Sequence, residues 1–296
     1  MTKTPIEEYF DHIYCLTLKR RKDRQASANE MFRYLEISPT AIEWVFGPDR
    51  PVDHTGKPNG NMGCTLGHRM ILDDIIENEY PRSLVFEDDV AIAYDSPEMQ
   101  HLVEPQDVFQ NKIRPFLPRD WDMLYLGGQY ADNPICRLSP HTIRFNRMLT
   151  TSSYGITLEM AWRMAPSIQG VGPIDSLYGG FQSEAFCVVV QPRLFTQGKS
   201  FSDLTDKVDD NRPCMLDSHH EEMLISGVWR AALDGRLLFD SEINRREVAA
   251  PNDLNGQEVI IDGETFVIES VKLPAHPAPW RRGESITYTL VKTSAP

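Results

Sequence analysis

The chain has 296 residues and a formal net charge of −13, with 43 acidic against 30 basic side chains. Its 41% apolar and 25% charged residues are the proportions of an ordinary soluble globular protein, and the length provides ample core. The acidic excess opposes loose binding to nucleic acid or to anionic membranes. No apolar run approaches the roughly 20 residues that a membrane-spanning helix needs.

The cysteines and the first residues indicate where the chain resides. Five cysteines are scattered along the sequence, and no two of them form a CxxC pair. An odd, scattered set favours neither a disulfide framework nor a zinc knuckle. Residues 4–8 do not read as a signal peptide. We therefore expect reduced cysteines and a cytoplasmic location.

The first predicted strand leads into a basic turn. Residues 13–18 predict a buried strand, and residues 19–24 then hold five cations interrupted only by Asp23. A helix should follow, because apolar residues recur at helical spacing as far as Leu35. A basic turn between a strand and a helix start suits an anion, since free N–H groups and side-chain charges converge there. The alternative is a solvated basic loop.

A long loop and a helix come next. Residues 41–46 predict the second strand, and residues 47–63, rich in Pro, Gly, Asn and Asp, predict a surface loop. A helix is expected over residues 65–78, because its isoleucines and leucine form i,i+4 pairs. His68 would lie in the first turn of this helix. It is expected either to contact a ligand or to hold the neighbouring loop by a hydrogen bond.

The third predicted strand ends in three consecutive carboxylates. Residues 83–86 form a short, largely apolar run, and Glu87, Asp88 and Asp89 follow. Strand alternation would place Glu87 and Asp89 on one face and Asp88 on the other. Two ionised carboxylates about 4 Å apart repel by about 4 kcal/mol at a dielectric of ~20. A divalent cation removes that repulsion, and hard oxygen ligands suit Mg²⁺ or Mn²⁺. The alternative is a solvated acidic turn.

Alternating strands and helices continue downstream and indicate an α/β domain. Helices are predicted over 108–117 and 158–168, and strands over 122–126, 142–149, 153–157 and 185–190. Gly127 and Gly128 follow the strand at 122–126. They either let the backbone approach a ligand closely or simply form a turn.

The C-terminal part differs in character. A helix is predicted over residues 217–233, and a small β unit from residue 252 onward. In that unit Asp262-Gly263 separates two β-branched runs, which is a strong hairpin signal, and a last strand is expected at 285–291. The predicted division is residues 1–246 and residues 247–296.

Three motifs occur in a fixed order: the strand and basic turn over residues 13–24, the Gly-Cys-Thr-Leu-Gly-His segment over residues 63–68, and the acidic strand end. Together they resemble glycosyltransferase family 25, the lipooligosaccharide-type sugar transferases that include collagen galactosyltransferases. The similarity extends over residues 12–205. Thr17 and Gly67 depart from it, where the family usually has Asn and Ser.

The resemblance implies a GT-A-like fold, a Rossmann-type mixed sheet flanked by helices, here with a small C-terminal all-β appendage. It implies a metal-dependent hexosyltransferase that moves a sugar from a nucleotide donor, expected to be a UDP-sugar, to a hydroxyl on a glycan with inversion. The implied donor contacts are Thr17, Leu18, Arg20, Arg24, His68, Glu87 and Asp88. The implied ligands of Mn²⁺ or Mg²⁺ are Asp89, Glu87 and Asp203, with His219 and His220 as further candidates.

Residues 172–175, Gly-Pro-Ile-Asp, resemble a Pro-x-Asp segment of that family, which makes Asp175 the predicted catalytic base. Inversion requires a group that takes the proton of the acceptor hydroxyl. A turn-capping role is the alternative.

Two other functions stay open for the whole chain. One is a phage-type transferase acting on hydroxymethylated DNA bases, which the net charge of −13 disfavours. The other is a non-catalytic member that binds a glycan or a partner.

Overall fold

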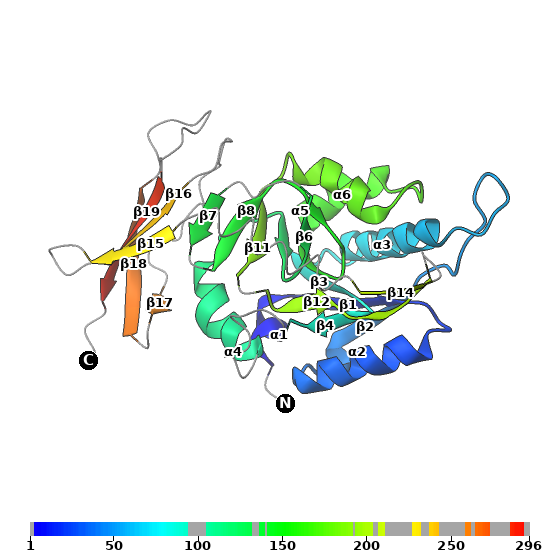
Figure 1. The fold of residues 1–296 in the computed structure, drawn as a ribbon, viewed down its shortest axis with the longest axis horizontal. Coiled ribbons are helices and arrows are strands. Elements are labelled where there is room, and N and C mark those ends of the chain that lie inside the picture. Colours follow the sequence, from blue (N-terminus) through cyan, green and yellow to red (C-terminus); the bar gives the residue numbers. More distant parts are fainter. Residues whose placement is uncertain are drawn as a thin grey trace.

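The computed structural model describes residues 3–93, 105–131, 136–139, 141–191, 193–203 and 207–210, followed by five C-terminal strands. Its centre is an eight-stranded mixed sheet with the order β2-β1-β3-β10-β5-β11-β8-β7. Helices lie on both sides of this sheet (Figure 1). The predicted α/β fold with a mixed sheet flanked by helices is confirmed.

The first half of the chain forms the parallel part of the sheet. Strands β1 (His12–Thr17), β2 (Ile42–Phe46) and β3 (Arg82–Glu87) pair in parallel, with β1 in the middle. Helices α2 (Lys22–Tyr34) and α3 (Gly60–Glu77) connect them. All three strands match the prediction. Because they run in parallel, the residues at their carboxyl ends meet at one edge of the sheet.

The second half adds strands of both directions. Strand β10 (Ser153–Thr157) runs antiparallel between β3 and β5 (Met123–Tyr125). Strand β11 (Cys187–Val190) is parallel to β5 and antiparallel to β8 (Thr142–Phe145), which pairs with β7 (Cys136–Ser139) at the edge. The start of β10 therefore lies beside the carboxyl end of β3.

Shorter elements complete the domain. They are α1 (Pro5–Tyr9), η1 (Pro39–Ala41), β4 (Val90–Ile92), α4 (Pro105–Val108), η3 (Phe109–Ile113), η4 (Arg114–Phe116), β6 (Gln129–Tyr130), β9 (Met148–Leu149), α5 (Leu158–Met164), η5 (Ala165–Ser167), α6 (Ile174–Gln182), β12 (Phe195–Gln197), β13 (Ser200–Ser202) and β14 (Lys207–Asp209). The helix predicted over residues 108–117 is instead a series of α, π and 3₁₀ turns, the last of which contains Pro115. None of the described helices is long and apolar enough to cross a membrane.

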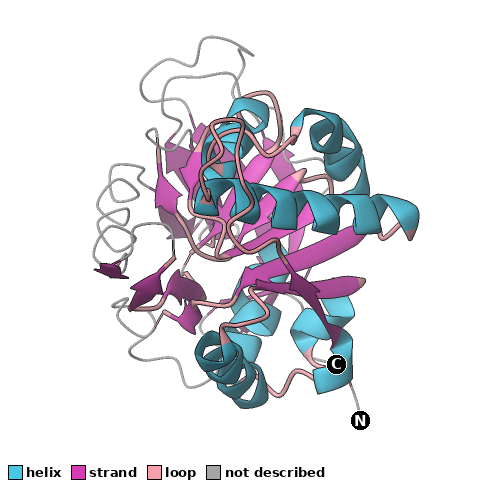
Figure 2. Cartoon of the chain, turned by 90° about the vertical axis from the view of Figure 1, so that its right-hand side faces the viewer, coloured by secondary structure: helices cyan, strands magenta, loops and turns pink. Residues whose placement is uncertain are grey.

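The core occupies both faces of the sheet, as side-chain alternation requires. Leu84 and Phe86 of β3 pack in a buried cluster with α1 and α2 residues, whereas Val85 packs in a second cluster with residues of α3, α5 and α6. Figure 2 shows the strands between these two groups of helices. Glu87 follows Val85 by two positions, so it continues the face that α3 covers.

Helix α3 begins earlier than predicted. It starts at Gly60, because the Asn59 side chain caps it by accepting a hydrogen bond from the backbone N–H of Met62 at 3.1 Å. The glycines of this first part of the helix concealed it from the sequence prediction. His68 therefore lies well inside α3 rather than in its first turn. Cys64, four residues earlier, lies on the same face.

The C-terminal strands form a separate five-stranded sheet, β15-β16-β19-β18-β17, drawn apart from the main sheet in Figure 1. The strands are β15 (Gly227–Ala231), β16 (Leu237–Glu242), β17 (Glu258–Ile261), β18 (Glu264–Lys272) and β19 (Ser285–Lys292). The predicted hairpin is confirmed, because Ile261 pairs with Glu264.

The helix predicted over residues 217–233 is wrong where the structure describes it. Residues 227–231 form β15, which pairs antiparallel with β16. The hydrogen bonds and side-chain contacts of this pairing decide the conformation, although the apolar residues have helical spacing. The C-terminal sheet thus includes strands on both sides of residue 247. The division at that residue stays a prediction.

Gly127 allows two backbone segments to approach each other closely. A Cβ at this position would lie 1.9 Å from the Phe195 carbonyl oxygen. We expect Gly127→Ala to lower the free energy of unfolding by about 3 kcal/mol or more, because backbone atoms must shift. Gly180→Ala is the matched control, since its Cβ would meet no described atom within 4 Å. In α6 that change should stabilise by about 0.5–1 kcal/mol. Urea unfolding of both variants measures the difference, and equal stabilities would contradict this role.

Candidate functional site

A cavity of about 130 Å³ lies at the carboxyl ends of β1 and β3. Thr17 ends β1 and Glu87 ends β3, so the sheet itself positions both residues at the cavity. The residues that line it are Leu16, Thr17, Leu18, Arg24, Gly47, Pro48, Arg50, Gly60, Gly63, Cys64, Glu87, Asp88, Asp89, Gln197, Ser202 and Asp203. An edge of this kind is the usual place for a ligand in an open α/β sheet.

Glu87 is held on the α3 side of the cavity. Its Oε1 lies 2.9 Å from His68 Nε2 and accepts a hydrogen bond from Thr151 Oγ1 at 2.5 Å. The other ring nitrogen of His68, Nδ1, lies 2.9 Å from the Tyr154 hydroxyl, which in turn lies 3.0 Å from the Tyr178 hydroxyl. Burial opposes ionisation of Glu87, but the His68 interaction and the Thr151 hydrogen bond hold its pKa below the ordinary value.

Asp88 and Asp89 share a single cation. Arg24 Nη1 lies 2.9 Å from Asp88 Oδ1 and 3.2 Å from Asp89 Oδ2. Thr17 Oγ1 donates to Asp88 Oδ2 at 2.6 Å. The predicted alternation, with Asp89 on the Glu87 face and Asp88 opposite, is wrong because β3 ends at Glu87 and a turn follows. Glu87 faces α3, whereas both aspartates face Arg24 of α2.

The buried Asp89 carboxylate has fewer hydrogen-bond partners than those of Glu87 and Asp88. Its Oδ2 accepts a hydrogen bond from Gln197 Nε2 at 3.0 Å, but its buried Oδ1 has no hydrogen-bond partner among the described residues. Burial raises the pKa of Asp89 to about 7, with the charges of Glu87 and Asp88 adding to the rise and Arg24 opposing it. A buried carboxylate with an open oxygen is a fitting ligand for a cation.

The basic turn is paired with carboxylates. Arg20 donates to Asp49 at 2.6 Å and to Asp203 Oδ1 at 2.8 Å, and Arg21 donates to Asp203 Oδ2 at 2.6 Å. Burial opposes ionisation of Asp203, but these two arginines lower its pKa. Both oxygens of Asp203 therefore already accept hydrogen bonds, whereas Asp89 keeps one open. The metal-ligand role of Asp203 stays a prediction.

The cavity brings most of the predicted site residues together. Those that line it are Thr17, Leu18, Arg24, Glu87, Asp88, Asp89 and Asp203. Arg20 and His68 do not line the cavity but bind two lining residues, Asp203 and Glu87, respectively. Asp175 does not line the cavity; it lies in the first turn of α6 and accepts a hydrogen bond from the backbone N–H of Ser176 at 2.7 Å. His219 and His220 lie outside the described residues.

Sequence reasoning missed several contributors. Cys64 lines the cavity, and its spacing of four from His68 would have indicated a shared helix face. Gln197 and Thr151 reach the acidic motif from distant parts of the chain, so their contacts with it depend on the complete fold. Cys64 is a free thiol, as are Cys15 and Cys187.

The charges of the lining favour a divalent cation. Four carboxylates line the cavity, whereas the cations of the described lining are Arg24 and Arg50. Asp203 is already paired with Arg20 and Arg21, Asp88 and Asp89 share the Arg24 guanidinium, and Glu87 pairs with His68. The acidic motif offers carboxylate oxygens, which suit Mn²⁺ or Mg²⁺.

Comparisons with known proteins agree with the sequence motifs. Residues 57–177 match the family profile described as Glycosyltransferase family 25 (LPS biosynthesis protein). Procollagen galactosyltransferase 1-A of Xenopus laevis is 30% identical over 144 residues, which is 42% of this chain and 22% of that protein. Inactive glycosyltransferase 25 family member 3 of Homo sapiens is 28% identical over 150 residues, 44% of this chain and 24% of that protein. The chain thus matches about a quarter or less of the length of these two relatives.

Two solved structures show distant likeness. Mannose-1-phosphate geranyltransferase from Thermus thermophilus aligns over 62% of this chain and 75% of its own, at 10% identity and a TM-score of 0.34. A glycosyltransferase involved in the glycosylation of the major capsid of PBCV-1 aligns over 61% and 93%, at 10% identity and a TM-score of 0.28.

Proposed function

With its resemblance to glycosyltransferase family 25 confirmed, we propose that this chain transfers a sugar from a nucleotide-sugar donor to a hydroxyl acceptor on a glycan. The observation that carries the proposal is the grouping of Glu87, Asp88 and Asp89 with Arg24 in one cavity at the carboxyl ends of β1 and β3. The names of the matched relatives give no support to a nucleic-acid acceptor.

The donor side of the proposal uses the carboxylates and the basic residues. Asp89, with Glu87 or Asp88, would hold Mn²⁺ or Mg²⁺, which when bound neutralises charge on the leaving phosphate. Thr17 and Leu18, at the end of β1, would contact the nucleotide, for which a UDP group is proposed. Arg24 would then divide its hydrogen bonds between the aspartates and the donor phosphates.

The acceptor side requires a base. Asp175 is proposed to take the proton of the acceptor hydroxyl, which would make the transfer inverting. Asp175 lies on α6, three residues before Tyr178, whose hydroxyl lies 3.0 Å from the hydroxyl of Tyr154, the partner of His68. A reduced, cytoplasmic setting is proposed on the free cysteines of the described residues.

One observation favours a second, non-catalytic function. Arg24 already occupies the position between Asp88 and Asp89, where its guanidinium supplies the positive charge that a metal would bring. Some relatives carry the word inactive in their names. In that case the cavity would bind a sugar or a partner without transfer.

Metal removal separates the two functions. We expect the protein, incubated with Mn²⁺ and a panel of nucleotide sugars, to release free nucleotide from one of them. EDTA should abolish the release, and added Mn²⁺ or Mg²⁺ should restore it, because three carboxylates then regain their counter-ion. Full activity in EDTA would remove the metal from the proposal. No release with any donor, together with retained sugar binding, would favour the non-catalytic function.

A further inference from the structure

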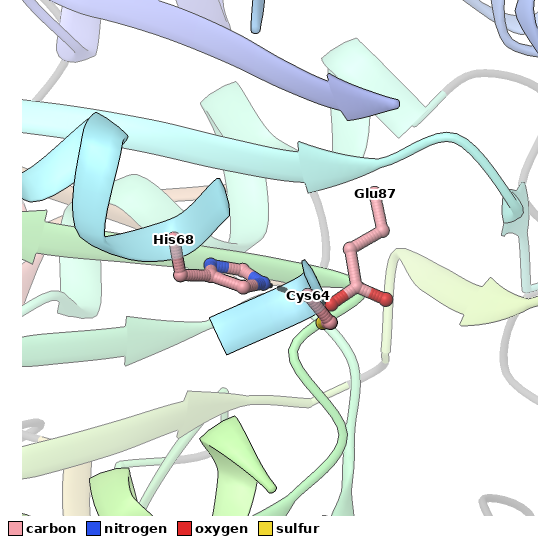
Figure 3. Close-up of side chains that lie close together, drawn as sticks. All are labelled: Cys64, His68 and Glu87. Atoms are coloured by element: carbon pink, nitrogen blue, oxygen red, sulfur yellow. Dashed lines mark hydrogen bonds and ion pairs between the residues drawn. The ribbon is translucent and has the colours of Figure 1, made fainter. Parts of the chain in front are cut away.

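Cys64, His68 and Glu87 bring three kinds of metal-ligating group to one point of the cavity wall. One ligand atom of each lies within 4.8 Å of those of the other two. Figure 3 shows the His68 imidazole and the Cys64 side chain directed toward the Glu87 carboxylate. Ligand atoms at about 2.0–2.3 Å from one tetrahedral ion lie roughly 3.5 Å apart. Small side-chain rotations are therefore enough to place all three around an ion.

The residues that form hydrogen bonds with these ligands have the arrangement that is found around metal ions in proteins. A metal-ligating histidine uses one ring nitrogen for the ion and donates from the other to an oxygen. His68 Nδ1 has such a partner in the Tyr154 hydroxyl, which leaves Nε2 for the ion. Thr151 fixes the Glu87 carboxylate by a hydrogen bond. His68 itself is fully buried, so its ring cannot turn away into solvent.

We propose that Cys64, His68 and Glu87 bind a borderline-soft divalent cation, with Zn²⁺ preferred, and leave a fourth position open to the cavity. Thiolate, imidazole and carboxylate together suit Zn²⁺, whereas Mg²⁺ and Mn²⁺ prefer oxygen ligands alone. Binding releases the thiol proton of Cys64 to solvent, and His68 coordinates as a neutral imidazole. Cys64 and Glu87 both line the cavity, so the fourth ligand can be water or a bound molecule.

This site goes beyond the proposed transfer reaction. It lies on the α3 side of the acidic motif, whereas Asp88 and Asp89 face Arg24 on the α2 side. Glu87 is the one ligand that both sites could share, through its two oxygens. Metal binding at this site is measured without any transfer reaction, so the result does not depend on a donor or an acceptor.

Cobalt serves as the spectroscopic probe. Co²⁺ added to the full chain should give the near-ultraviolet sulfur-to-metal charge-transfer band, and Zn²⁺ but not Mg²⁺ should displace it. Cys64→Ser should remove the band. Cys187→Ser is the matched control, because that buried thiol contacts the Gln182 carbonyl, a bond that a hydroxyl can also make. Absence of the band in the unaltered protein, or its persistence in Cys64→Ser, would overturn the proposal.

Two further measurements remain informative if Cys64→Ser folds poorly. In the unaltered protein, Zn²⁺ should slow maleimide labelling of Cys64, read by mass spectrometry, by at least about tenfold, because a metal-bound thiolate is shielded. Tyr154→Phe, which keeps every ligand, should weaken Co²⁺ binding by about 10–100-fold. Unchanged labelling of Cys64 with Zn²⁺ present would overturn the site. Unchanged Co²⁺ affinity in Tyr154→Phe would overturn the positioning role of Tyr154.

Discussion

Asp89→Asn is expected to reduce turnover by at least about 10²–10³-fold while the protein stays folded, because a neutral amide cannot offer the charged oxygen that a catalytic cation requires. The side chain is 7% exposed and its Oδ1 has no hydrogen-bond partner in the described part of the chain, so the change removes a charge from a buried site. Steady-state nucleotide release and thermal unfolding measure the two effects. Asp73→Asn is the control, since Asp73 is exposed on α3 and pairs with Arg69. Undiminished turnover in Asp89→Asn would exclude Asp89 as a ligand.

The same variant should change how stability depends on pH. The pKa of Asp89 is raised from 3.8 to about 7 by burial, so between these values the folded protein holds a proton that the unfolded chain has released. The free energy of unfolding therefore falls as the pH rises through this window, and the penalty is complete above it. Asp89→Asn lacks that penalty. Its stability relative to the unaltered protein should rise from below pH 4 to above pH 7, and a constant difference would contradict the shift.

Arg24→Ala should be the most destabilising exchange in the basic turn. It leaves Asp88 and Asp89 buried without their shared counter-charge, which costs about 3–5 kcal/mol for a buried ion pair that loses one partner. Arg24 also donates to Ser200 Oγ at 2.8 Å and to the Phe201 carbonyl oxygen at 2.9 Å, bonds that are lost together with the charge. Denaturant unfolding above pH 7, where the carboxylates are ionised, measures the loss.

Two companion variants decide the cause of that loss. Arg20 is 45% exposed and pairs with Asp49 and Asp203, and Asp203 keeps its pair with Arg21, so Arg20→Ala should cost only up to about 1 kcal/mol. Combining Arg24→Ala with Asp88→Asn should recover part of the stability, since one buried charge is then removed. A double variant as unstable as the sum of its single changes would assign the loss to packing of the arginine stem instead.

The sequence predicted the parts of the site that lie on single elements. The carboxyl ends of β1 and β3 were predictable because each strand is a short apolar run followed by charged residues. The two strands pair in parallel, so these ends lie side by side. The start of α3 was misplaced because Gly60 and Gly63 disguise a helix that Asn59 caps. Residues 227–231 were misplaced because strand pairing with β16 decides their conformation. Partners such as Gln197, 108 positions from Asp89, depend on the complete fold.

The hydrogen bonds from Tyr178 through Tyr154 and His68 to Glu87 join α6 to the end of β3. Tyr178 lies three residues after Asp175 on α6, so this buried chain connects the proposed acceptor side to the proposed donor side. A displacement of α6 by an arriving acceptor would lengthen one of these bonds and alter the setting of Glu87. Occupancy of either side would in that case change the affinity of the other by the same factor, because such linkage is reciprocal.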